Sequence, residues 1–466
     1  MLKTFLNVFK VPELRNKVLF TLFMLAVYRV GFSVPLPGVD QDKFQEIMQQ
    51  SSGAGTDAAA RLANYVAIFS GGSLSHSTIF GLGVMPYISA SIIFQLLTTV
   101  VPTLEKLKKE GESGQRKIQE WTRYVTLPLA LVQGYFWLGY IESQGIIQST
   151  WTGTFAFWFL GLTILVAGCM FIMWLGEQID EYGLGNGISL IIMAGILSQM
   201  PGAIGTLVSS FSSTDSSGSA IGTGDIIFLL VSFVAVTAGA ILITQAQRRI
   251  PIQQAKHTRG RRVYGGQKQF LPLRLNHGGV MPIIFAQSLM LFPGVLLAAF
   301  ATWTLAADGN NGVVHMFFNY MKEQFSFGNF LYVIVECGLI FFFAYFWTTI
   351  QFQPKEIANQ LRDYGSFVPG IRPGPRTADY LERVMMRITY VGAAFLCVIA
   401  VIPTVISAYL NIPPNVASFL GGTGLLIVIS VALDMVQRIE ANLMMRNYGG
   451  FLSDNNNKGK RIRGRN

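Results

Sequence analysis

Apolar stretches of about 20 residues recur along this sequence from end to end. A helix of that length crosses a hydrocarbon core of about 30 Å. Only 13% of the 466 residues are charged, whereas soluble domains average about 25%. The sequence therefore predicts an all-α polytopic membrane protein with ten transmembrane helices, at 18–36, 76–101, 122–141, 153–176, 187–206, 224–246, 278–303, 329–352, 384–407 and 418–437.

Basic residues favour one side of the predicted membrane. Successive helices alternate in direction, and 31 of the 35 Lys and Arg residues lie in the segments on the side of both termini. Cytoplasmic segments carry such an excess, which predicts that both termini are cytoplasmic. One segment on that side, GEQIDEYGLGNG, has three acids and no base, but acids contribute little to this rule. The net charge of +10 is thus explained by membrane topology without nucleic-acid binding.

The ten helices divide into two sets of five. Because five is odd, the second set enters the membrane from the opposite side, and two similar halves form an inverted repeat. GVMPYI at Gly83–Ile88 is nearly repeated as GVMPII at Gly279–Ile284, in the second helix of each half. Gly and Pro interruptions at matching places indicate a functional interface between the halves. The alternative is coincidence, because these residues are common in membrane helices.

The predicted domains follow from this division. They are a cytoplasmic N-terminus (1–17), an N-terminal half (18–206), an extracytoplasmic linker (207–223), a C-terminal half (224–437) with cytoplasmic loops at 247–277 and 353–387, and a basic cytoplasmic tail (438–466).

The predicted membrane interior holds few ionisable residues. Away from the ends of the predicted helices, Arg29 and Glu336 are the only charged candidates, and packing or snorkelling is favoured over substrate binding for both. Transporters of ions or metabolites retain such groups at membrane depth for function. Aliphatic residues instead recur at helical spacing, as in Val84 with Ile88 and Val280 with Ile284. Such stripes are typical of packing, and a sharper interpretation is a hydrophobic constriction that gates a pore by dewetting.

Three segments outside the predicted helices are unusual. RLANYVAIFSGG at 61–72 is too short to cross a membrane, so it is interfacial or re-entrant. The loop at 247–277 carries eight Lys and Arg residues and could face anionic lipid or form a shaped projection. In the loop at 353–387, prolines flank Arg372 and stiffen the tip, which favours an acidic protein or RNA partner.

Signals for enzymatic chemistry are weak. The four histidines have no metal-ligand spacing, and the three cysteines lie singly inside predicted helices. GLGNG at 183–187 lacks the Lys-Ser/Thr of a phosphate-binding loop. We therefore expect no cofactor, no metal site and no enzymatic activity.

Several motifs together resemble the SecY family. They are MPYISASIIFQLL, EKLKKEGESGQRKI, MWLGEQIDEYGLGNGIS, GRRVYGGQ and FVPGIRPG, and the likeness runs from about residue 15 to residue 450. It implies a clamshell of two five-helix halves, an hourglass pore and a lateral gate that opens to lipid. Val84 is smaller than the isoleucine expected there, and the loop at 209–224 matches no motif.

The resemblance also implies site residues. The pore-ring positions are Val84, Ile88, Ile188, Ile192, Ile284 and Ile427. The plug is the segment 61–72, with Arg61, Leu62, Tyr65, Ile68, Phe69, Gly71 and Gly72. The lateral gate, formed by the second, third, seventh and eighth helices, includes Ser89, Gln95 and Ser288. The residues that meet a motor or ribosome are Arg261, Arg262 and Arg372.

The implied function is that of the central channel subunit of a bacterial Sec translocase. Such a subunit moves unfolded, signal-bearing polypeptides across the plasma membrane and membrane proteins laterally into it. The implied partners are SecE and SecG as a heterotrimer, the SecA motor, the translating ribosome, signal peptides, preproteins, membrane lipids and, further, SecD/SecF, YajC and YidC. Two alternatives are a secondary transporter with inverted repeats, which fits the architecture but not the scarcity of charge, and an intramembrane enzyme.

Overall fold

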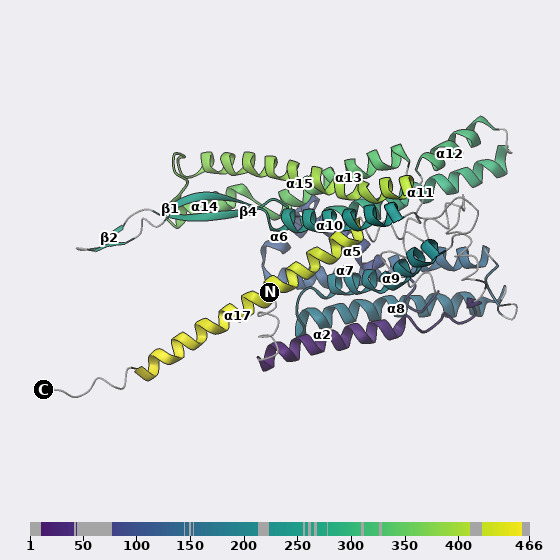
Figure 1. Cartoon of the computed structure of the whole chain (residues 1–466), viewed down its shortest axis with the longest axis horizontal. Helices are drawn as coiled ribbons and strands as arrows, with labels where there is room; N and C mark the ends of the chain where they lie inside the picture. The colour runs from purple at the N-terminus through teal and green to yellow at the C-terminus, as the bar shows by residue number, and fades with distance from the viewer. Residues whose placement is uncertain are drawn as a thin grey trace.

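The computed structural model is mostly helical (Figure 1). It describes residues 11–41, 43, 77–143, 145–148, 151, 153–212, 223–254, 257–259, 262–264, 268–276, 278–308, 312–325, 329–410 and 422–458.

The N-terminal half is built from five long helices and one short one. They are α2 (Pro12–Gly31), α5 (Met85–Val100), α6 (Pro102–Lys109), α7 (Glu112–Ser143), α8 (Phe155–Tyr182) and α9 (Gly187–Ser212). Prolines stand in the first turns of α2, α5 and α6, where a missing N–H leaves no helical bond unmade. Val101 precedes Pro102 and is extended, as a pre-proline residue prefers. The chain therefore bends by 99° between α5 and α6.

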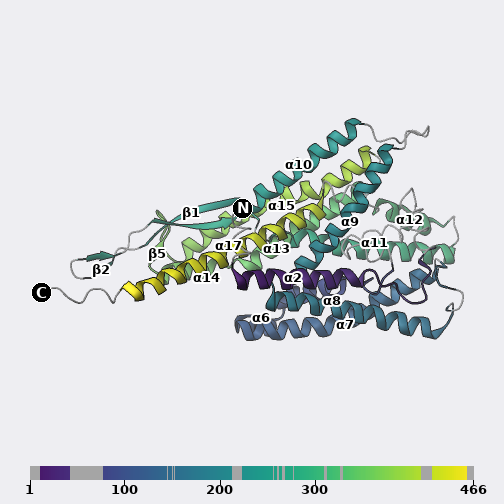
Figure 2. The same ribbon diagram turned by 60° about the horizontal axis from the view of Figure 1, so that its bottom comes forward.

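The C-terminal half combines helices with short strands. Its helices are α10 (Thr223–Gln245), α11 (Met281–Asp308), α12 (Val313–Gln324), α13 (Phe330–Gln351), α14 (Pro354–Asp363), α15 (Pro375–Leu410) and α17 (Thr423–Lys458). Figure 2 shows α2, α7 and α8 in one group and α10, α13, α15 and α17 in another.

Each of the ten predicted transmembrane segments overlaps a described helix. Four helices in the described ranges are by themselves long and apolar enough to cross a membrane, namely Phe155–Tyr182, Ile227–Gln245, Phe330–Asp363 and Pro375–Ile406. Others are bent or short, as are Gly187–Gly202 and Met281–Met290. The chain is thus a polytopic helical membrane protein in which not every described helix is by itself long and apolar enough to cross the membrane.

Two predicted helix boundaries were wrong. The segment expected at 76–101 becomes helical only at Met85, because residues 77–84 form turns that include Gly83 with φ of 55°. The segment expected at 18–36 ends as a helix at Gly31. Pro35 beyond it forms a β-bridge with Thr78, so two stretches predicted as helix meet instead as extended chain.

The loop at 247–277 forms a β-hairpin that an all-α prediction omitted. Strand β1 (Gln247–Gln254) pairs antiparallel with β4 (Lys268–Arg274), and β5 (Ser366–Phe367) joins the other edge of β1. A second pair, β2 (His257–Arg259) and β3 (Arg262–Tyr264), lies further along the same projection (Figures 1 and 2). Ile250 and Ile252 are buried while Arg249 and Pro251 are exposed, the alternation of a strand with one covered face.

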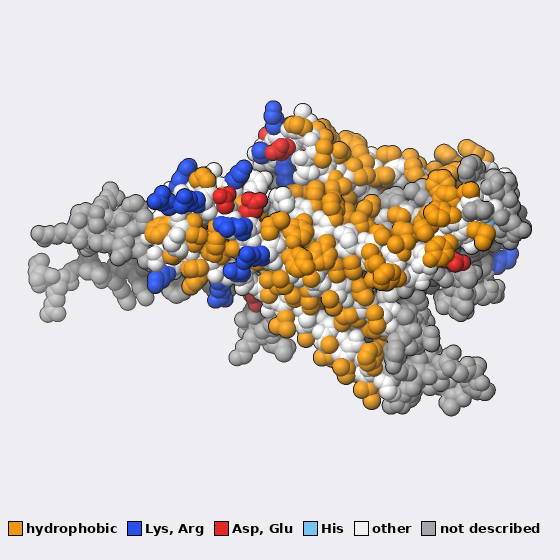
Figure 3. All heavy atoms as spheres, turned by 90° about the horizontal axis from the view of Figure 1, so that it is seen from above, with side chains coloured by type: hydrophobic (Ala, Val, Ile, Leu, Met, Phe, Trp, Pro, Cys, Tyr) orange, Lys and Arg blue, Asp and Glu red, His pale blue; other side chains and the backbone are white. Residues whose placement is uncertain are grey.

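One end of the molecule is basic. Figure 3 shows Lys and Arg side chains gathered at the end where β1 and α14 lie, and hydrophobic side chains over the rest of the visible described surface. Helix α2 begins and α17 ends toward that same end (Figure 1). This arrangement agrees with the charge asymmetry in the sequence.

Candidate functional site: an apolar ring between the two halves

The duplicated hexapeptide adopts one backbone conformation twice. Gly83 and Gly279 have φ of 55° and 58°, a left-handed conformation in which a side chain is unfavourable. Helices α5 and α11 then begin at the methionine of each copy, Met85 and Met281. The similarity therefore extends from the letters to the way in which each helix starts.

The first helical hydrogen bonds correspond as well. The N–H of Ile88 donates to the carbonyl of Val84 at 3.0 Å, and the N–H of Ile284 donates to the carbonyl of Val280 at 3.2 Å. Each motif thus places an isoleucine at the same point of the first helical turn. In three dimensions, Ile88 and Ile284 belong to one apolar cluster, so the two copies converge.

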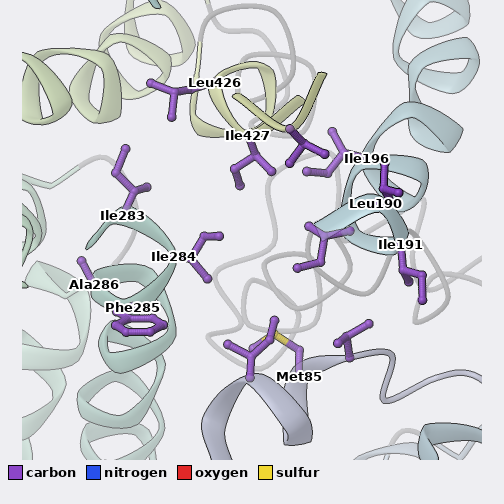
Figure 4. Close-up of a cluster of buried hydrophobic side chains, with 14 of the residues drawn as sticks. Met85, Leu190, Ile191, Ile196, Ile283, Ile284, Phe285, Ala286, Leu426 and Ile427 are labelled. Atoms are coloured by element: carbon purple, nitrogen blue, oxygen red, sulfur yellow. The ribbon is translucent and has the colours of Figure 1, made fainter. Parts of the chain in front are cut away.

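The six predicted ring residues come together in that cluster. Val84, Ile88, Ile192, Ile284 and Ile427 are buried, and the partly buried Ile188 packs against them. In Figure 4, Ile284 projects from α11 and Ile427 from α17 into one central space. Helices α5 and α9 border the same space from the opposite side. Four helices from both halves therefore contribute to one aliphatic centre.

A cavity of about 440 Å³ lies against this centre. Its walls include all the predicted ring residues except Val84. Val280 and Val431 also line it. Helical spacing had paired Val280 with Ile284 in the sequence, whereas Val431 was not singled out. Val431 stands four residues from Ile427, so the same i, i+4 spacing was the signal that could have identified it.

The remaining cavity wall combines apolar side chains with polar ones that are mostly uncharged. Amide side chains line it from both halves, namely Gln95, Gln115, Gln119, Asn186 and Gln351. Lys108 and Asp180 are the charged residues in its wall. The cavity thus places amide side chains beside the aliphatic ring, between the two halves.

The three predicted gate residues lie on the two helices that start with the duplicated motif. The hydroxyl of Ser89 donates to the carbonyl of Met85 at 3.0 Å, and that of Ser288 donates to the carbonyl of Ile284 at 2.8 Å. The side-chain nitrogen of Gln95 donates to the hydroxyl of Ser91 at 3.5 Å. These bonds all stay within one helix, so they do not tie α5 to α11.

The two intramembrane ionisable residues have different surroundings. Arg29 is exposed, and its guanidinium carbon lies 5.5 Å from the ring centroid of Phe32, an arrangement that fits a cation–π contact. Glu336 is only 2% exposed and accepts a hydrogen bond from Gln287. Arg29 thus contacts an aromatic ring, whereas Glu336 belongs to a buried group of polar side chains.

The basic loop residues are described unequally. Arg372 is exposed at a tip where Gly370 and Gly374 have φ of 85° and 105°. The hydroxyl of Thr377 donates to the carbonyl of Arg372 at 2.9 Å, a contact that fixes the tip and that the sequence did not reveal. Arg262 lies in β3, while Arg261 and the predicted plug at 61–72 lie outside the described residues.

No cluster of three or more His, Cys, Asp or Glu side chains suited to a metal ion occurs within the described ranges. Cys169 and Cys397 are buried and Cys337 is half-buried. The thiol of Cys397 donates to the carbonyl of Cys337 at 3.5 Å. These cysteines contribute to packing between helices.

The fold and the site together define a class: an α-helical membrane protein whose two halves meet at an aliphatic centre. The family model that matches the chain is described as SecY and covers residues 78–436. Because this match spans more than half of the sequence, the chain belongs to the SecY family.

Known relatives and solved structures agree with that membership. The protein translocase subunit SecY of Thermus thermophilus is 41% identical over 476 residues, which cover 100% of both chains. Among solved structures, one titled as a protein conducting channel matches with a TM-score of 0.60 at 16% identity, over 92% of each chain. The Sec61 channel of a canine ribosome-channel complex matches with a TM-score of 0.57 at 16% identity, also over 92% of each chain. The fold is therefore the ten-helix clamshell of these channels, with two inverted halves.

Proposed function

We propose that this protein is the central channel subunit of a Sec translocase and that the aliphatic ring is its seal. The observation that carries the proposal is the convergence of ring residues from α5, α9, α11 and α17 beside a cavity that both halves line. As a member of the SecY family, the chain is a channel subunit and not an enzyme.

An aliphatic ring suits a channel for unfolded polypeptides. Water does not stably fill a narrow apolar neck. The closed ring therefore resists the passage of ions although it contains no charged side chain. Isoleucine and valine offer no hydrogen-bonding side chain, so the ring holds no particular residue of a passing chain. The amide-lined cavity offers donors and acceptors to a polypeptide backbone before it reaches the ring.

The lateral gate is the seam between α5 with α7 and α11 with α13. Each of these helix pairs packs within its own half, and the gate side chains Ser89, Gln95 and Ser288 bond within their own helices. Parting the two halves along this seam therefore breaks none of these hydrogen bonds. A signal peptide could then leave sideways toward lipid.

The basic end of the molecule indicates where cytoplasmic partners would bind. We propose that it faces the cytoplasm of a bacterial cell, with the chain in the plasma membrane and both termini on that side. Arg261, Arg262 and Arg372 would meet the SecA motor or the ribosome there. SecE and SecG would complete the heterotrimer, segment 61–72 would act as the plug, and SecD/SecF, YajC and YidC would be further partners. The proposed domains are a cytoplasmic N-terminus (1–17), two halves (18–206 and 224–437), the linker between them (207–223) and a cytoplasmic tail (438–466).

One experiment tests the assignment directly. The native complex is purified from its membrane, its small subunits are identified, and the complex is reconstituted into vesicles with SecA and ATP. Protection of a signal-bearing preprotein from external protease is the expected result. If vesicles accumulate a small solute but never protect the preprotein, the secondary transporter is the better function. The Glu336–Gln287 pair is the polar group that such a transporter would use.

A further inference from the structure

A buried polar cluster joins three helices of the C-terminal half. The side-chain nitrogen of Gln287 in α11 lies 3.3 Å from Oε1 of Glu336 in α13 and 3.2 Å from Oγ1 of Thr423 at the start of α17. The three residues are 5%, 2% and 6% exposed. One amide group therefore donates to two acceptors on two other helices.

The cluster is costly to maintain, which argues for a role. A carboxyl group at membrane depth is unfavourable and persists where it serves function. Facing the amide nitrogen toward both acceptors leaves Oε1 of Gln287 buried without a partner among the described residues, a further penalty. A leucine would pack in the same place without either penalty.

The position of the cluster relative to the ring indicates what that role is. Gln287 follows the ring residue Ile284 by three positions, and Thr423 precedes the ring residue Ile427 by four. Residues at these spacings share one helix face. The hydrogen bonds from Gln287 thus hold α11 and α17 together about one turn from the two ring side chains that face each other in Figure 4.

We propose that Gln287 is a positioning residue, anchored by Glu336, that fixes the separation of Ile284 and Ile427. This inference rests on the proposed function of the ring. It means that α11, α13 and α17 move as one unit when the halves part, so that the C-terminal wall of the ring keeps its shape. Opening then separates the two halves and does not spread the isoleucines within one half.

The test removes the connection without stranding a charge. In the double variant Gln287→Leu/Glu336→Leu both partners become apolar, a replacement that is often nearly neutral for folding. In the exchanged variant Gln287→Glu/Glu336→Gln the amide and carboxyl change places and the bond is kept. The matched control is Thr389→Val, which removes a buried 3.2 Å hydrogen bond between α15 and α13 that touches neither ring helix.

Two quantities are measured on the full translocase in its membrane: export of a preprotein with a defective signal sequence, and resting ion conductance. The double leucine variant is expected to raise both by about five- to tenfold, the usual effect of a buried hydrogen bond on an equilibrium. The exchanged variant and Thr389→Val are expected to stay near wild type. Equal increases in the double leucine variant and Thr389→Val would overturn the inference, because any loosening of the half would then suffice.

Ile284→Asn in the same assays separates this inference from the proposed function. If Ile284→Asn raises export and conductance while the double leucine variant does not, the ring assignment stands and the role of Gln287 is wrong. If neither variant changes them although both are stably inserted, the ring assignment itself is wrong. Wild-type behaviour of the exchanged variant together with a leaky double leucine variant supports the connection specifically.

Discussion

Replacing one ring isoleucine by asparagine is expected to shift the channel toward its open state. Ile284 is 4% exposed and Ile192 is 6% exposed, so an amide at either position is enclosed by aliphatic side chains. Burying an amide without a hydrogen-bond partner costs about 1–3 kcal/mol in proteins. The open ring is wet and does not impose this cost. The difference disfavours the closed state by about 1–3 kcal/mol, a change of about 5- to 150-fold in the closed-to-open ratio.

The assay is the export of a preprotein whose signal sequence is defective. With Ile192→Asn or Ile284→Asn, less binding energy from the signal is needed to open the channel, so export should rise by a factor within that range. The two changes lie in one cluster, so their effects need not add. Leucine at the same positions keeps volume and apolarity and should change little. Stably inserted asparagine variants that remain as strict as wild type would refute the reasoning.

Three further predictions concern other regions. Arg372→Glu should block translocation but not insertion, because a like-charge clash at a docked interface costs several kcal/mol, and normal secretion would contradict it. Deleting residues 61–72 should raise resting conductance in planar bilayers more than it lowers export, and unchanged conductance would count against a plug. Gly279→Ala should lower the free energy of unfolding in detergent by about 1–2 kcal/mol, because its φ of 58° disfavours a residue with a Cβ. A Cβ at this position would meet no atom within 4 Å, so the cost comes from the backbone conformation alone. Gly338→Ala, also in open space but within α13, should be neutral or slightly stabilising.

The sequence predicted the helices well because lipid imposes a simple rule. Every backbone group in the hydrocarbon must be bonded internally, so each long apolar stretch becomes a helix. The rule says less where apolar segments are sheltered by protein. Residues 77–84 are mostly apolar yet form turns, and all of them except Ile79 are buried within the protein. The hairpin of β1 and β4 was not predicted, because the alternation in β1 rests on two buried residues, Ile250 and Ile252, which is too short a pattern to distinguish a strand from a basic loop.

The site was predictable in part. Ile88 and Ile284 could be paired from the repeated hexapeptide, and the structure places them in one cluster. Ile427 was assigned to the ring by family resemblance alone, since nothing in the sequence distinguishes it from other isoleucines in membrane helices. The connection from Gln287 to Thr423 spans 136 positions, and no spacing rule reaches across such a separation. Contacts between distant helices become visible only in three dimensions.

The hairpin also has a mechanical consequence. Strand β1 starts at Gln247, directly after α10, and the N–H of Leu275 donates to the carbonyl of Ala246 at 2.9 Å, which closes the base of the hairpin between α10 and α11. Its inner face packs on Leu381 and Val384 of α15. The hairpin is thus held at its base between α10 and α11 and along one face by α15. A force on the far end of the hairpin is therefore transmitted to the start of α11, the helix that carries Ile284.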